Sequence, residues 1–147
     1  MKLNKKIKEP IESILPKPYE PKRKNRWIVK FKDNEEINAW YLASAQRPKL
    51  SHGFLSCLTG YNIADMVIEL RDPIGSALNK TLLDIFKNKV KFDFQLEMLD
   101  PTGVVVENWE IKKCRILEID FGELDYSNDG LATITLKIRP KEVKLIY

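Results

Sequence analysis

One stretch of strict alternation between apolar and polar side chains constrains the fold of this sequence more than any other feature. Every second residue from Phe92 to Met98 is apolar, and the residues between them are charged or polar. This two-residue period is typical of a β-strand with one buried face. An Asp-Pro-Thr-Gly turn follows at 100–103, and an extended pattern resumes over 104–112. The segment therefore predicts an antiparallel β-hairpin.

Other segments repeat the strand signal in shorter form. They are residues 26–32, 37–45, 66–71, 115–121 and 131–139. In the last of these, Ala132, Ile134, Leu136 and Ile138 are expected to point inward. After Pro140, the residues Val143, Leu145 and Tyr147 are expected to extend this strand along a sheet edge.

A single helix is predicted in the middle of the chain. Apolar residues recur at helical spacing from Leu78 to Phe86, and Ser76 is placed to cap the N-terminus. Residues 48–64 are weakly patterned and are expected to form a loop. The fold class predicted is mainly β: an antiparallel β-sandwich or partly open barrel of about seven strands with one α-helix.

The N-terminal residues differ from the rest in composition. Residues 1–32 hold 11 of the 25 Lys and Arg residues but only 3 of the 21 acidic ones, which leaves 14 basic and 18 acidic residues beyond. Four prolines between 10 and 21 favour extended conformations. We expect a basic arm at 1–24 and a β domain at 25–147. The arm cations expected to contact neighbouring subunits are Lys5, Lys6, Lys8, Lys17, Lys22, Arg23 and Lys24.

The sequence offers no pattern of an enzyme, a metal site or a cofactor site. His52 is the single histidine, and Cys57 and Cys114 belong to no paired motif, so both thiols are expected to be reduced. A phosphate-binding glycine loop is not present. A secretory signal and an apolar run long enough for a membrane span are also missing, so no membrane insertion is expected.

The C-terminal third carries a specific pattern, made of the hairpin followed by Trp109, the segment IDFGELDYSND at 119–129, and the alternating strand at 132–138. This pattern resembles the tail tube protein family of contractile-tailed bacteriophages. The segment KRKNRWIVKF at 22–31 is also similar to the opening strand of the family, and ASAQRP at 43–48 is similar to one of its strand ends. One departure is Lys113, which stands where many members have glycine.

This resemblance implies a structural subunit without catalytic activity. Its rings, hexameric in the family, would stack into a tube whose lumen conducts DNA during ejection. The implied partners are further copies of the chain, the tail sheath protein, baseplate or tube-initiator proteins, and tape-measure protein and DNA transiently in the lumen. The implied location is the virion tail, assembled in the host cytoplasm. A tube initiator at the baseplate and an injection-system tube subunit are the alternatives within the family.

Physical reasoning adds an expectation about the lumen. Because DNA is a dense polyanion, a mildly acidic wall would let it slide without sticking. The candidate lumen-facing residues are Asp93, Glu97, Glu107, Glu110, Glu118 and Asp120. A competing interpretation is a β-barrel that binds single-stranded nucleic acid through the cations and aromatic side chains of residues 22–32.

Overall fold

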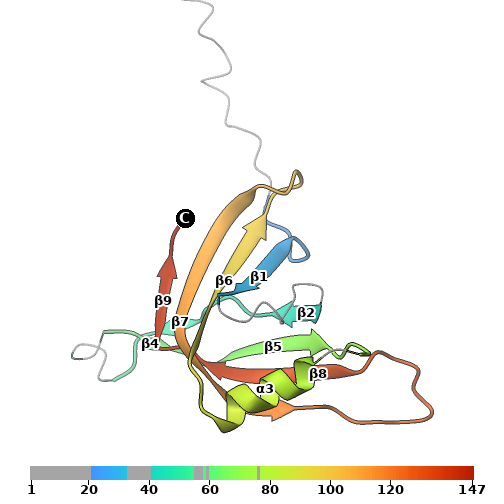
Figure 1. Cartoon of the computed structure of the whole chain (residues 1–147). Coiled ribbons are helices and arrows are strands. Elements are labelled where there is room, and N and C mark those ends of the chain that lie inside the picture. The colour runs from blue at the N-terminus through green and yellow to red at the C-terminus, as the bar shows by residue number, and fades with distance from the viewer. Residues whose placement is uncertain (1–20, 33–40, 55–57, 59, 76) are drawn as a thin grey trace, which may run out of the picture.

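The computed structural model describes residues 21–32, 41–54, 58, 60–75 and 77–147. Within these residues the chain forms one helix and nine strands (Figure 1). In chain order they are β1 (Trp27–Phe31), β2 (Leu42–Ala45), β3 (Leu50–Ser51), β4 (Asn62–Ile63), β5 (Met66–Arg71), α3 (Leu78–Lys87), β6 (Phe92–Leu99), β7 (Val105–Asp120), β8 (Thr133–Arg139) and β9 (Glu142–Leu145).

Seven of the strands form one antiparallel sheet that folds back on itself at β7. The strand order is β1-β6-β7-β8-β5-β2, and β9 pairs with β7 beside this path. The N-terminal half of β7 pairs with β6 and β9, and its C-terminal half pairs with β8. The two halves of the sheet face each other as the layers of an open sandwich (Figure 1). The predicted fold class is therefore confirmed.

The long strand β7 corrects one expectation. The sequence pattern suggested two strands, at 104–112 and 115–121, but a single strand of 16 residues runs through both. Lys113 lies at the break with a left-handed φ of 53°. This backbone conformation is unfavourable for any residue that has a Cβ atom. The backbone N–H of Lys113 donates a hydrogen bond of 2.9 Å to Asp93 Oδ1 on β6, which supports the bend.

The core lies between the two halves of the sheet and under the helix. The inward faces of β6 and β8 are those that alternation predicted, and Val29 and Phe31 of β1 also enter the core. Three phenylalanines, Phe31, Phe92 and Phe94, pack together with ring centroids 5.6–6.2 Å apart. From α3, Leu78, Leu82 and Ile85 enter this core, whereas Phe86 is exposed. Ser76 lies outside the described residues, and the capping position is Ala77, which forms no side-chain cap.

Smaller differences from the sequence expectations concern the strand ends. β2 begins at Leu42, and residues 37–40 lie outside the described part of the chain. The region expected to be a loop contains the short pair β3 and β4. Ala132 precedes β8 and is exposed. β9 does not continue β8, because the chain turns at Pro140 and pairs with β7 instead.

Candidate assembly surfaces

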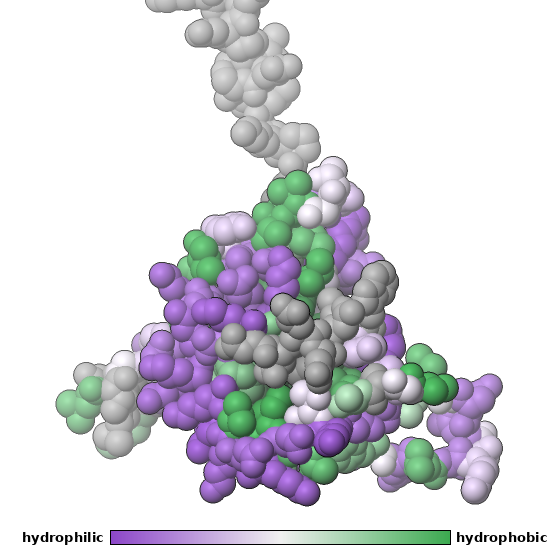
Figure 2. Space-filling model, viewed as in Figure 1, coloured by the Kyte–Doolittle hydropathy of each residue, from purple (hydrophilic) through white to green (hydrophobic). Residues whose placement is uncertain are grey.

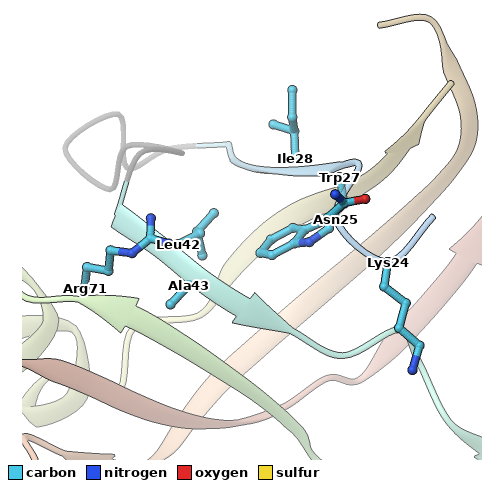
Figure 3. Close-up of a pocket in the computed structure, with 7 residues that line it drawn as sticks. All are labelled: Lys24, Asn25, Trp27, Ile28, Leu42, Ala43 and Arg71. Carbon is cyan, nitrogen blue, oxygen red and sulfur yellow. The ribbon is translucent and has the colours of Figure 1, made fainter. Parts of the chain in front are cut away.

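Among the described strands, β9 pairs with β7 alone and is one edge of the sheet. The sheet is also open along β1 and β2, the two ends of its strand path. Each pairs on one side only with a described strand, so each has a free edge that can accept another strand. A groove lies between these edges, and one part of it has a volume of about 530 Å³. The indole of Trp27 lies between the two strands, with Lys24 and Arg71 at opposite ends (Figure 3).

A buried carboxylate fixes the point where the basic arm leaves the domain. Glu107 is 6% exposed, because the alternation of β7 puts it on the inward face of the sandwich, together with Trp109 and Ile111. It pairs with Lys22 and with Arg47, whose Nη1 is 3.4 Å from Glu107 Oε1. The Nε1–H of Trp109 also donates to Glu107 Oε1. Lys22 is thereby tied to the end of the sandwich.

The ionisation of Glu107 reflects this arrangement. Burial raises the pKa of the Glu107 carboxyl, but hydrogen bonds from Lys22, Trp109 and Arg47 outweigh the burial, so its pKa lies below the ordinary value. The other arm residues are differently placed. Arg23 and Lys24 are exposed, whereas Lys5, Lys6, Lys8 and Lys17 lie outside the described residues.

Two of the six candidate lumen acids are taken up within the subunit. Glu107 points into the sandwich, as described above. Glu97 is 5% exposed and pairs with Lys30, whose Nζ lies 3.0 Å from Glu97 Oε2. Neither acid is therefore a solvated charge. Glu107 is on the inward face of β7, whereas Glu97 is on the outward face of β6, opposite to Leu96 and Met98, as expected, and is covered there by Lys30. The cause is the packing of long cationic side chains over the carboxylates, which a sequence pattern does not reveal.

The other four candidates do not share one face of the domain. Asp93 and Glu110 lie on the outer face of the half formed by β1, β6, β9 and the start of β7. Glu118 and Asp120 lie opposite Lys137 and Thr135 on the outer face of the other half. Because the two outer faces point away from each other, at most one of these pairs can line a lumen.

Two projections at opposite sides of the molecule each carry several exposed apolar side chains, while others, such as Ile74 and Tyr147, are exposed elsewhere. One is the connection between β7 and β8, residues 121–132, which we call the acidic loop. It presents Leu124, Tyr126 and Leu131, of which Leu124 is 92% exposed. The other is the connection from β3 to β4, with Phe54 98% and Tyr61 48% exposed. Figure 1 shows the two connections on opposite sides, and Figure 2 shows hydrophobic surface on both.

Local hydrogen bonds define the shape of the acidic loop. Asp125 Oδ1 accepts bonds from the N–H and the hydroxyl of Ser127, at 2.9 and 2.7 Å. These bonds lower the pKa of the Asp125 carboxyl. Gly122 has a φ of 78°, and a Cβ at this position would be 3.1 Å from the carbonyl oxygen of Thr133. Glycine is therefore required where the loop leaves β7.

A cleft is lined by residues of β4, β7 and β9 and of the segments next to them. Figure 1 shows β4 and β9 on the side of the domain away from the acidic loop. We call this cleft the lysine cleft, and its volume is about 520 Å³. Its lining residues are Gly60, Tyr61, Ile63, Glu110, Lys112, Lys141, Glu142, Val143 and Lys144.

The charges of the lysine cleft are partly compensated. Glu110 pairs with Lys112 at 2.8 Å, and Glu142 pairs with Lys113 at 2.9 Å. Lys141 and Lys144 form no ion pair with a described carboxylate. The cleft therefore combines apolar lining with two cations available to a partner.

The residues weighed as reactive groups take ordinary positions. His52 is exposed, and Cys57 lies outside the described residues. Cys114 is buried, and burial raises the pKa of its thiol to about 12. In the described part of the chain, no three His, Cys, Asp or Glu residues are grouped as a metal site. Over the same residues, no helix has the length and apolar character of a membrane span.

Comparison with known proteins relates the fold to contractile machines. No protein-family model matches the sequence, and no curated protein is similar to it in sequence. Among solved structures, a chain of the anti-feeding prophage cap, which terminates the tube, is similar with a TM-score of 0.65 and 14% identity over 92% of this chain and 97% of that one.

Two further solved structures extend this similarity. A chain of the sheath/tube terminator of the extracellular contractile injection system PVC has a TM-score of 0.63 and 14% identity, over 88% of this chain and 99% of that one. The Hcp1 protein of E. coli EAEC 042 has a TM-score of 0.61 and 10% identity, over 83% and 91%. The chain therefore has the fold of tube and cap proteins of contractile injection systems.

Proposed function

We propose that this chain is a structural, non-catalytic subunit of the tube of a contractile phage tail or a related injection system. The observation that carries the proposal is the placement of exposed apolar side chains on opposite sides of a domain with a tube-protein fold. Such a surface fits a protein whose neighbours cover it.

The positions of these surfaces support ring formation. A contact between two different patches on opposite sides of a subunit is heterologous; it closes into a ring when the rotation between neighbours closes on itself, and otherwise it gives an open filament. The open edges of β1 and β2 provide further surface for neighbours within a ring or between rings. By resemblance to the tail tube family, we propose hexameric rings that stack.

The proposed tube has a lumen lined by one outer face of the sandwich. Either Asp93 and Glu110 or Glu118 and Asp120 would then contribute acidic side chains to its wall. In a phage tail, this lumen would hold the tape-measure protein and conduct DNA. The sheath and the baseplate proteins would contact the outside and the end of the tube.

A position at one end of the tube is the second candidate. Similar structures include a cap that terminates a tube and a sheath/tube terminator, which supports a terminating or initiating subunit.

Binding of single-stranded nucleic acid has less support. Lys22 and Lys30, two of the cations on which it depended, are paired with Glu107 and Glu97 within the domain.

Electron microscopy of the full-length protein, alone and with its neighbouring tail proteins, tests the proposal. We expect rings that stack into a hollow tube. Single rings found only at a tube end would favour the terminating or initiating role. A protein that stays monomeric at high concentration and is missing from every assembled particle would overturn the tube proposal.

A further inference from the structure

The acidic loop combines exposed apolar side chains with negative charge. Glu123, Asp125 and Asp129 are its acids, and residues 121–132 contain no Lys or Arg. Leu124 and Leu131 are 92% and 77% exposed, and Tyr126 is fully exposed. An apolar group that is this exposed in an isolated subunit is typical of a surface that a partner covers.

Local hydrogen bonds hold the shape of the loop within a single subunit. The turn at Asp125 is followed by a second one, in which Asn128 Oδ1 accepts a bond of 2.8 Å from the N–H of Gly130. A third bond, from the N–H of Gly122 to Asp120 Oδ1 at 2.8 Å, fixes the start of the loop. A loop already held in one shape loses less conformational entropy on binding.

The lysine cleft has the complementary properties. Tyr61, Ile63 and Val143 give it apolar lining. Lys141 and Lys144 give it cations that form no ion pair with a described carboxylate, although Lys141 interacts electrostatically with Glu142 and Lys144 is opposite Glu110. The strands β4 and β9 that contribute to it lie on the side of the domain away from the acidic loop (Figure 1). A single subunit therefore carries both surfaces but presents them in opposite directions.

We propose that the acidic loop of one subunit docks into the lysine cleft of the next copy of this chain. Leu124 and Tyr126 would cover the apolar lining, while Glu123 and Asp129 would meet Lys141 and Lys144. The pairing rests on the ring assembly proposed above, and it assigns the residues that join one subunit to the next around the ring.

Charge reversal on each side separately tests this pairing. One variant carries Glu123→Lys and Asp129→Lys, which leaves the turn-forming Asp125 intact. The other carries Lys141→Glu and Lys144→Glu. Each alone should raise the protein concentration needed for assembly about tenfold or more, because like charges then face each other across the contact. Lys80→Glu with Lys87→Glu, on the exposed side of α3, is the matched control and should assemble as the wild type does.

Mixing the two variants provides the decisive result. In an equimolar mixture, each reversed loop can meet a reversed cleft, and each native loop a native cleft, so alternating rings should form. Native mass spectrometry should then detect equal numbers of the two variants in each ring. Circular dichroism and thermal unfolding of each variant alone establish that the monomers are folded.

The outcomes separate this pairing from the proposed function. If the wild type assembles and both variants assemble equally well, the pairing is wrong and the tube proposal stands. Impaired variants that do not recover on mixing also overturn the pairing. A wild-type protein that never assembles overturns the ring itself, and the pairing with it.

Discussion

Replacing Glu107 by Gln tests the buried charge cluster at the base of the arm. The change removes the charge that Lys22 and Arg47 neutralise, while the amide oxygen can still accept the bond from Trp109. A hydrogen bond to a charged group contributes about 1.5–3 kcal/mol. The side chains of Lys22 and Arg47 are 46% and 57% exposed, so solvent screens both pairs. We therefore expect a loss of about 1–2 kcal/mol in the free energy of unfolding.

Thermal unfolding followed by circular dichroism measures this loss. At neutral pH, Tm should fall by about 3–6 °C. The matched control is Glu118→Gln on the exposed face of β7, for which a change within about 0.5 kcal/mol is expected. An equal Tm for the two variants would contradict the role assigned to Glu107.

The pH dependence gives a second and independent check. Folding lowers the pKa of Glu107 below its ordinary value of 4.5. The ionised carboxylate therefore contributes stability that is present above pH 4.5 and is lost as the pH falls through the lower, folded pKa. The difference in stability between wild type and Glu107→Gln should shrink on acidification below 4.5. A difference that stays constant across this range would show that the effect is not one of charge.

Three further outcomes are expected. Lys113→Gly should be more stable than Lys113→Ala by about 1 kcal/mol in thermal unfolding, because only glycine adopts a φ of 53° without strain; equal stability would contradict this. Leu136→Ala should cost about 2–5 kcal/mol in denaturant unfolding, since Leu136 is 1% exposed in the core, and a loss below about 1 kcal/mol would refute its core role. Deletion of residues 2–21 should leave a folded monomer, by circular dichroism, that assembles poorly in electron microscopy; a truncation that assembles normally would exclude an assembly role for the arm.

The sequence alone determined those strands, helix faces and turns that depend on the spacing of residues close together in the chain. The inward faces of β6 and β8 and the buried side of α3 follow from apolar spacing within a few residues. The hairpin turn follows from the residues at 100–103, where the side chain of Asp100 accepts bonds from Thr102 and Val104. Such patterns need no knowledge of distant parts of the chain, which is why the mainly β class could be predicted.

The tertiary structure alone decided which side of the domain each charge occupies. Before Lys113, the residues of β7 that point into the core have odd residue numbers, and after it they have even ones. Ile111 and Cys114 therefore both reach the core. A second irregularity between Ile116 and Glu118 restores the odd positions. One extra residue in a strand reverses the facing of everything beyond it. The sequence therefore identified the acidic residues, but the pairing of distant strands determined that they belong to different faces.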